Sequence, residues 1–268
     1  MKTMSAMVLL LSACAPKIVE VQDFRASAPE PLERSEFRLP TAQEAVLSNG
    51  LQVRYLQDES IPMSRVTVSF RLGSFLENDS NVGLVGATFD MLNEGIEGHD
   101  ALAISSAMKR LGSSLSAGGG LDGGYVSVNG LTRNLDESLT FLSGALLSPS
   151  FSDVEWQRLR KNYQQDLQKA KTTPGDIARR VFLNAFYGND YAGRMSTETS
   201  IDALDVETMS AWWAESAVVE NAMVVAYGNL SLEELLPKLE AALGGIPSGA
   251  AVETASPVGV ALEQTEIL

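Results

Sequence analysis

The hydrophobic side chains between residues 45 and 248 switch repeatedly between a two-residue and a 3.6-residue spacing, and this order of spacings constrains the fold most strongly. The two-residue spacing and turn residues predict strands at 46–47, 51–56, 65–72, 114–117, 125–131 and 222–226. The helical spacing predicts helices at 84–92, 100–111, 134–147, 152–171, 174–187, 206–216 and from 231 onward. This order indicates an α+β fold, an antiparallel or mixed sheet with helices packed on one face.

The N-terminus resembles a bacterial lipoprotein signal. Lys2 is followed by an apolar run over 4–11 that is too short to span a bilayer, and then by Leu11-Ser12-Ala13-Cys14. The similarity to a lipobox implies a signal peptide at 1–13, lipidation of Cys14 and a membrane anchor. Alanine after the cysteine favours, by the same resemblance, the outer membrane of the cell envelope, facing the periplasm. The alternative is a buried cysteine at the end of a first helix.

Two segments flank the regular part of the sequence. Residues 14–43 contain four prolines among charged residues without sustained periodicity, which predicts a tether. After Gly244-Gly245-Ile246-Pro247 the chain becomes rich in Ala, Ser, Gly and Val. We therefore expect a globular domain at 44–248 and a linker at 249–268 that leads towards a missing second domain.

The chain has one cysteine and one histidine, and this excludes several kinds of chemistry. Zinc-finger sites need four Cys or His ligands, hydrolytic zinc sites usually need two or three His, and a Ser/His/Asp triad would have to use His99. The net charge of −14 offers no surface to neutralise phosphates, so nucleic acid is not an expected partner.

Several stretches together resemble the N-terminal half of the M16 metallopeptidases, the pitrilysin, insulinase and mitochondrial-processing-peptidase group. They are Leu47–Val53, Gly83–Gly95, Ile104–Leu115 and Val224–Leu230. The similarity covers roughly 45–248, about one of the two homologous halves of a typical member. It implies the M16 peptidase-like domain, of the kind also found in LuxS and the mitochondrial processing peptidase.

The resemblance places the family's H-x-x-E-H motif on the helix that follows Gly83. In that motif two histidines four residues apart bind zinc, and the glutamate accepts a proton from the zinc-bound water. Here the two ligand positions hold Gly86 and Asp90, and the proton-acceptor position holds Phe89. The family's downstream glutamate falls on Asp166 and its supporting glutamate on Leu159.

This set of residues is poor in metal ligands. Glycine supplies no ligand, phenylalanine accepts no proton, and two carboxylates make a weak zinc site at neutral pH. Asp90 and Asp166 could hold a hard cation only with further oxygen ligands that the sequence does not show. We therefore expect no catalytic residue and no metal or other cofactor in this chain.

The remaining motifs have simpler explanations. Ser106-Ala107-Met108-Lys109 matches S-x-x-K by chance on an amphipathic helix, because its companion motifs are absent. The glycine-rich stretch 118–123 precedes a strand and predicts a hairpin turn rather than a phosphate loop. By the resemblance, Gly118, Gly119 and Gly120 lie on a possible substrate-strand edge. We expect at least two of the helical tryptophans, Trp156, Trp212 and Trp213, to pack in the interior, and Arg179-Arg180 to face solvent.

The resemblance implies a non-catalytic subunit. Many M16 members work as pairs in which one chain keeps the zinc motif, so a heterodimer with an active homologue is expected, with zinc in that partner and unfolded peptides as substrates. One alternative is a stand-alone peptide-binding or envelope-assembly lipoprotein. A third possibility, an active zinc metalloendopeptidase, requires activity despite Gly86 and Phe89.

Overall fold

The computed structural model describes residue 28 and residues 40–260. The chain divides after Leu39 into two units, and everything below concerns the second unit, which begins at Pro40. The expected signal peptide at 1–13, the lipidation site Cys14 and most of the expected tether lie outside the described residues.

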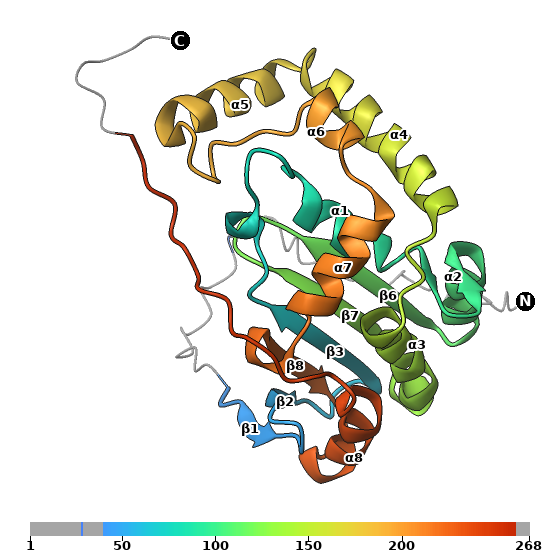
Figure 1. The fold of residues 1–268 in the computed structure, drawn as a ribbon. Helices are drawn as coiled ribbons and strands as arrows, with labels where there is room; N and C mark the ends of the chain where they lie inside the picture. Colours follow the sequence, from blue (N-terminus) through green and yellow to red (C-terminus); the bar gives the residue numbers. More distant parts are fainter. Residues whose placement is uncertain (1–27, 29–39, 261–268) are drawn as a thin grey trace, which may run out of the picture. The chain divides into compact units, whose positions relative to one another are not determined.

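The centre of the unit is a six-stranded mixed sheet (Figure 1). Its strands in spatial order are β1 (Gln43–Val46), β2 (Gln52–Gln57), β8 (Ala222–Gly228), β3 (Met63–Phe70), β7 (Gly124–Leu131) and β6 (Ser113–Gly119). β2 and β8 are parallel, whereas all other neighbours are antiparallel. A separate two-stranded sheet joins β4 (Gly95–Ile96) and β5 (His99–Asp100).

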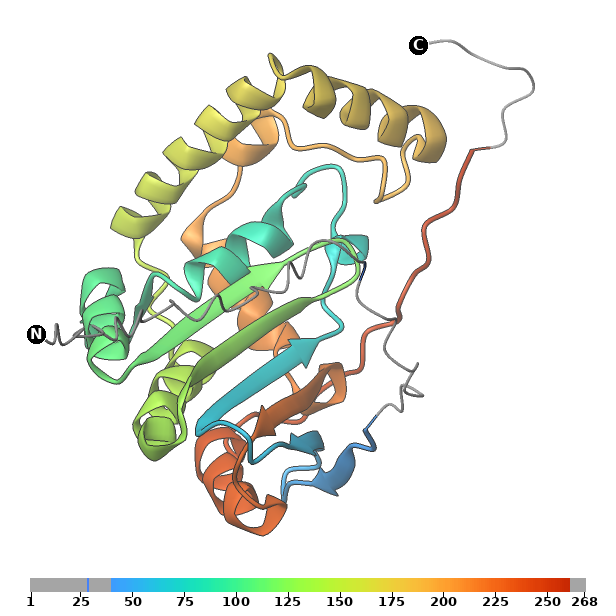
Figure 2. The same ribbon diagram turned by 180° about the vertical axis from the view of Figure 1, so that it is seen from behind.

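The helices cover one face of the sheet, which confirms the predicted fold class (Figures 1 and 2). They are α1 (Leu84–Met91), α2 (Ala101–Arg110), α3 (Leu135–Leu147), α4 (Asp153–Ala170), α5 (Pro174–Tyr187), α6 (Glu198–Asp202), α7 (Val206–Ser216) and α8 (Leu232–Leu243). α1 packs against β6, α3 packs against β7, and α8 packs against α3. α4 and α5 follow each other beyond α1, away from the strands (Figure 1).

Alternation along the strands separates a buried face from an open face. In β3, Val66, Val68 and Phe70 are buried, whereas Arg65 is exposed and its neighbours at 67 and 69 are half-buried. The buried face meets an aromatic cluster in which Trp213 lies edge-on to both Phe70 and Phe89. The covered face of the sheet therefore forms the core.

The predicted packing of the tryptophans is confirmed for Trp156 and Trp213, whose side chains are 1% and 3% exposed. Each indole N–H donates to a buried main-chain carbonyl, that of Leu204 for Trp156 and that of Leu146 for Trp213. Trp212 is partly buried against the same core. Arg179 faces solvent as predicted, but Arg180 is half-buried and donates to the carbonyl of Ser196.

The first hairpin is confirmed, although its turn is wider than the Asn49-Gly50 pair suggested. Val46 pairs with Gln52, so five residues connect the strands. Leu47 and Leu51 are buried, and the Asn49 amide donates to the main-chain carbonyls of Leu243, the last residue of α8, and Ile246. The loop is wide because its leucines and its asparagine are used in packing. The short helix α6 and the β4–β5 pair were not predicted, since neither is long enough to show a periodicity.

Residues 247–260 run in an extended path beside the unit (Figure 1). Side chains from two places hold this segment, the turn before β8 and the loop after α5. Asn221 bonds to Ala250 and Val252, Glu220 accepts from Gly249, and Tyr191 donates to Ala255. The expected linker is thus hydrogen-bonded to the body of the unit over its described residues. No described helix combines the length and the apolar character that a bilayer crossing requires.

Candidate functional site

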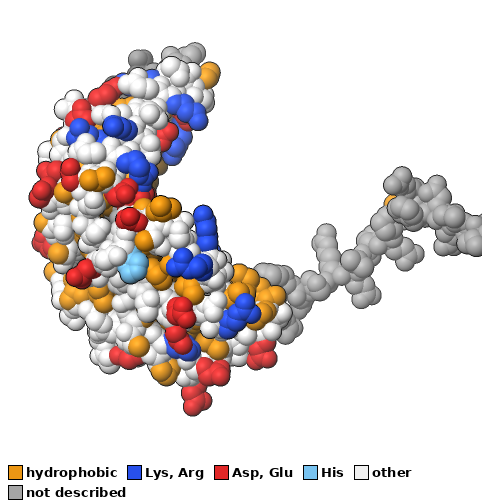
Figure 3. Space-filling model, turned by 90° about the vertical axis from the view of Figure 1, so that its right-hand side faces the viewer, with side chains coloured by type: hydrophobic (Ala, Val, Ile, Leu, Met, Phe, Trp, Pro, Cys, Tyr) orange, Lys and Arg blue, Asp and Glu red, His pale blue; other side chains and the backbone are white. Residues whose placement is uncertain are grey.

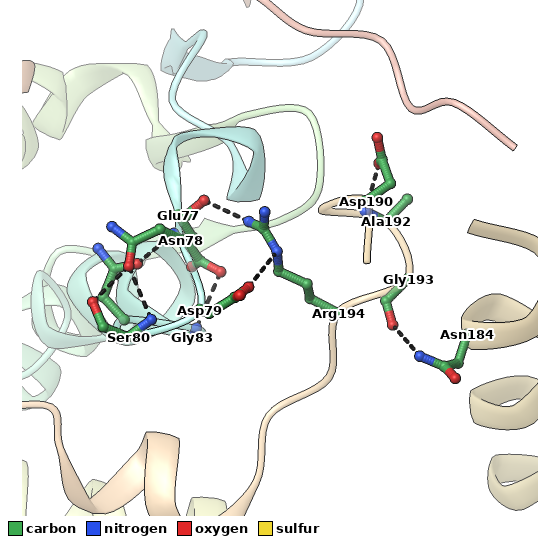
Figure 4. Close-up of polar contacts among 11 residues, drawn as sticks. Glu77, Asn78, Asp79, Ser80, Gly83, Asn184, Asp190, Ala192, Gly193 and Arg194 are labelled. Atoms are coloured by element: carbon green, nitrogen blue, oxygen red, sulfur yellow. Dashed lines mark hydrogen bonds and ion pairs between the residues drawn. The ribbon is translucent and has the colours of Figure 1, made fainter. Parts of the chain in front are cut away.

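The start of helix α1 is fixed by a buried carboxylate (Figure 4). Glu77 accepts hydrogen bonds from the main-chain N–H groups of Gly83 (3.1 Å) and Val85 (2.8 Å), two donors that the helix itself leaves unpaired. Gly83 has a φ of +99°, a conformation that glycine adopts without strain. Burial raises the pKa of Glu77, and its N–H donors and Arg194 only partly offset this effect.

Arg194 connects this helix start to the loop that follows α5 (Figure 4). Its guanidinium donates to the carbonyl of Glu77 at 2.6 Å. Its Nε lies 3.1 Å from Asp79 Oδ1, an ion pair in which the N–H does not point well enough to count as a hydrogen bond. The position of α1, and of every side chain on it, therefore depends on contacts with the segment around Arg194.

The two positions matched to zinc ligands, Gly86 and Asp90, lie four residues apart on α1 and face helix α4. Tyr163 on α4 fills the space between them. Its hydroxyl donates to Asp90 Oδ2 at 2.5 Å, and a Cβ added at Gly86 would lie 3.9 Å from the same hydroxyl oxygen. A phenol thus lies over the helix face where the family has two imidazoles.

Burial and nearby charge keep the phenol of this contact protonated near neutral pH. Burial, followed by the charge of Asp90, raises the pKa of Tyr163 far above its usual range, so the phenol stays protonated and donates. Burial also raises the pKa of Asp90, which the hydrogen bond from Tyr163 partly counteracts. The acidic side chain of Asp90 therefore has one short, directed donor in the Tyr163 hydroxyl.

Phe89, at the position matched to the proton acceptor, points into the core. Its side chain is fully buried, with the Phe70 ring 6.0 Å away and the Trp213 ring 5.4 Å away between centroids. The ring also fills space that a Cβ would need at Gly119 (2.8 Å) and at Gly124 (2.3 Å). Phenylalanine here joins α1 to the ends of β6 and β7 and has no atom that accepts a proton.

The remaining two matched positions do not complete a ligand set. Leu159 is half-buried against the core, and Asp166 is exposed, although its charge contributes to the raised pKa of Tyr163. Within residues 40–260, no three His, Cys, Asp or Glu side chains are grouped so that they could hold a metal ion. Zinc needs three or four N, S or O donors at about 2 Å, so the residues present do not fit it.

The possible substrate edge comprises Gly118 and Gly119 at the end of the edge strand β6, and Gly120 directly after it. Its outward main-chain groups are partly used by the chain itself. The Asn93 amide accepts from the Ala117 N–H (2.7 Å) and donates to the Ala117 carbonyl (3.0 Å). The N–H of Ser74 donates to the carbonyl of Gly120. An added strand would have to displace these contacts, and Gly119 is explained by the close approach of α1.

Sequence reasoning missed Tyr163, Asn93 and Glu77. Tyr163 lies four residues after Leu159 and three before Asp166, so helical spacing placed it on the face matched to the third ligand. Asn93 and Glu77 lie outside any segment with a hydrophobic periodicity, so no sequence pattern predicted their hydrogen bonds. His99 is exposed in β5 with its ring 5.7 Å from that of Phe141. Ser106 and Lys109 lie on α2, half-buried and exposed respectively, as the chance match predicts.

The α+β fold, the helix α1 with its matched positions Gly86, Phe89 and Asp90, and the edge strand β6 together define a peptidase-like class of domain. Residues 52–200 match the family described as Insulinase (Peptidase family M16). The chain belongs to this family, which confirms the resemblance seen in the sequence.

Three relatives resemble this chain in sequence or in fold. The "Non-peptidase homolog YmxG" of Helicobacter pylori (strain ATCC 700392 / 26695) is 22% identical over 203 residues, which cover 75% of this chain and 47% of that protein. A peptidase M16 inactive domain from Pseudomonas fluorescens superposes with a TM-score of 0.76 at 21% identity, covering 82% of this chain and 54% of the other. The first half of the periplasmic protease PqqL from Escherichia coli gives 0.70 at 17% identity, covering 84% and 51%. The chain spans about half the length of these relatives.

Proposed function

We propose that the chain is a non-catalytic M16 subunit that pairs with a zinc-bearing homologue, and that the pair binds and processes unfolded peptides in the periplasm. One observation carries the first part: the Tyr163 hydroxyl occupies the face between Gly86 and Asp90 and bonds to the carboxylate. Metal-assisted hydrolysis needs a polarised water and a proton acceptor beside it. Within residues 40–260 no group of side chains could hold the metal that polarises the water, and Phe89 stands at the position matched to the proton acceptor.

The descriptions of two relatives support this reading. The H. pylori homologue is named a non-peptidase, and the P. fluorescens domain is called inactive. The two comparisons cover 75% and 82% of this chain. On this proposal, zinc and the catalytic groups come from the partner chain.

The proposed pairing rests on helix α5, which turns its apolar side outward. Its polar side is held by Arg180, which donates to Ser196, and by Asn184, which donates to Gly193. The opposite side exposes a stripe of large apolar side chains at helical spacing, Ile177, Val181, Phe182 and Phe186. Phe182 is 59% exposed and stacks on Phe186 with ring centroids 5.7 Å apart. Contiguous exposed apolar surface of this kind marks interaction sites, and we propose that the partner M16 chain packs here.

The test first asks whether the adjacent reading frame encodes an H-x-x-E-H homologue, and then co-expresses that homologue with this chain for affinity purification and a peptide-cleavage assay. We expect a stable pair that cleaves unfolded peptides faster than the homologue alone. Phe182→Asp together with Phe186→Asp should abolish the pair. A matched control is Leu102→Asp with Val154→Asp, because these side chains are 75% and 76% exposed but lie on α2 and α4.

Two outcomes contradict the proposal. If the pair forms but cleaves no faster than the homologue, the chain does not contribute to processing. If no pair forms, the alternative of a stand-alone peptide-binding lipoprotein is favoured.

The proposed location is the outer membrane, with the chain lipid-anchored through Cys14 and facing the periplasm. Two or three acyl chains, each contributing about 0.8 kcal/mol per buried methylene, anchor a protein stably. Metabolic labelling with a palmitate analogue should mark the wild type and leave Cys14→Ser unmarked. Equal labelling of both would refute the anchor.

A further inference from the structure

Helix α5 is held only lightly by its own side chains. None of its residues is buried, and the hydrogen bonds that its side chains donate, from Arg180 and Asn184, end in the loop that follows it. In Figure 3 the upper part of the unit, where Figure 1 places α4 and α5, projects beside a hollow. The position of α5 therefore depends on what holds that loop and the last turn of the helix.

Within the described residues, polar contacts with two other segments hold the end of α5 and the loop after it. One contact is made by Arg194, which reaches Glu77 and Asp79 before the start of α1. The other is made by the extended segment 249–260, which we call the strap. Three hydrogen bonds join the strap to this region: the Val260 N–H donates to the Phe186 carbonyl (2.6 Å), the Val258 N–H to Asp190 Oδ2 (3.3 Å), and the Tyr191 hydroxyl to the Ala255 carbonyl (3.0 Å).

The other end of the strap is fixed to the turn before β8. Asn221 in that turn is 1% exposed, and its amide donates to the Ala250 carbonyl at 3.2 Å and accepts from the Val252 N–H at 2.8 Å. Glu220 accepts from the Gly249 N–H at 2.8 Å. The Val252 side chain also packs against the core. The strap thus starts from a well-packed part of the unit and reaches the exposed helix.

The strap is held through its main chain. Every hydrogen bond described for it uses one of its own N–H or C=O groups, so hydrogen bonds of its side chains do not define its path. Between the two sets of contacts, Glu253 and Thr254 are exposed and make no described hydrogen bond. Gly259 lies against the Phe186 ring, where an added Cβ would be 2.9 Å from the nearest ring carbon. The end of the strap therefore packs on a side chain that belongs to the apolar stripe of α5.

We propose that the strap fixes α5 to the body of the unit and so keeps the apolar stripe in position for the partner chain, a role in pairing that rests on the proposed function. A helix without buried side chains opens at a low free energy unless other contacts hold it. A docking surface that is already ordered loses less conformational freedom when a partner binds. The strap orders α5 in advance, so severing the strap loosens the stripe before any partner arrives.

The test inserts a protease recognition sequence between Glu253 and Thr254 in the full chain and compares the uncut and cut forms by hydrogen exchange. We expect the amides in the last turns of α5 to exchange about tenfold faster after cutting, with those of α3 unchanged. Tyr191→Phe in the uncut chain loses only the hydroxyl that bonds to Ala255, and should accelerate this exchange by about twofold. Tyr187→Phe, on α5 itself, is the matched control, because that hydroxyl makes no described hydrogen bond.

Two exchange results would overturn the hold on α5. One is unchanged exchange of α5 in the cut chain, and the other is an equal acceleration in α3, which would indicate a general loosening of the unit. For pairing, the cut chain should bind the partner at least about fivefold more weakly than the uncut chain. Equal binding of both forms would overturn the role of the strap in pairing. Exchange is measured without the partner, so it still decides the hold on α5 if the uncut chain forms no pair and the proposed function fails.

Discussion

At the residue scale, Tyr163 and Asp90 account for the difference between this site and a metal site. The phenol is a donor held by burial and by nearby carboxylates, and Asp90 is its acceptor. The pair needs no metal to satisfy its hydrogen bonds, since each group has a partner in the protein. A site of this kind stabilises the contact between α1 and α4 instead of activating water.

The raised pKa of Asp90 predicts a pH-dependent cost to folding. Between the unfolded pKa and the raised folded pKa the native state binds more protons, so stability falls as pH rises through this window. Asp90→Asn keeps an acceptor for Tyr163 but removes the charge. Chemical denaturation at pH 4 and pH 7 should show that this variant gains more stability over the wild type at pH 7. A larger gain at pH 4 would contradict the assignment.

Gly119 allows α1 to approach the sheet. A Cβ there would lie 2.8 Å from Phe89 and 3.0 Å from the carbonyl of Val85, and neither a packed ring nor main chain moves easily. Gly119→Ala should therefore lower the free energy of unfolding by about 1–3 kcal/mol. Gly175→Ala is the control, because nothing lies within 4 Å of its added Cβ. Equal effects in urea unfolding would count against the packing explanation.

At the element scale, the β6 edge is held by a side chain from the segment after α1. Asn93→Ala removes both bonds to Ala117, so the Ala117 amide should exchange its hydrogen about tenfold faster, at a cost of about 1 kcal/mol in stability. Hydrogen exchange followed by NMR measures this directly. Asn129→Ala, on the open face of β7, should leave the Ala117 amide protected. Unchanged exchange in Asn93→Ala would show that the edge is protected in another way.

Elements with a sustained periodicity could be predicted from the sequence, and those fixed by distant contacts could not. The period-two residues of β3 and the i, i+4 relation of Gly86 and Asp90 follow from local geometry. α6 and the β4–β5 pair are too short for a period. Tyr163 meets Asp90 across 73 residues of sequence, so only the packing of α4 on α1 reveals the contact. The same limit hid Asn93, whose partner lies on another element.

At the scale of the whole molecule, the hydrophobic core and the proposed partner contact lie on different elements. The covered face forms the core with α1, α3, α7 and α8, and holds Phe89 in the place matched to the proton acceptor. Helix α5 exposes the apolar stripe that we propose as the partner contact. The relatives are about twice as long as the region that they share with this chain.

The central claim is that the M16 site of this chain binds no catalytic zinc because Tyr163 takes its place beside Asp90. The most direct measurement is isothermal titration of the purified, metal-free full chain with Zn²⁺ at pH 7.5, with Asp90→Asn and Asp166→Asn titrated in parallel. The account predicts no saturable binding at micromolar zinc and identical traces for all three proteins. One equivalent of zinc bound by the wild type and lost in Asp90→Asn would contradict it.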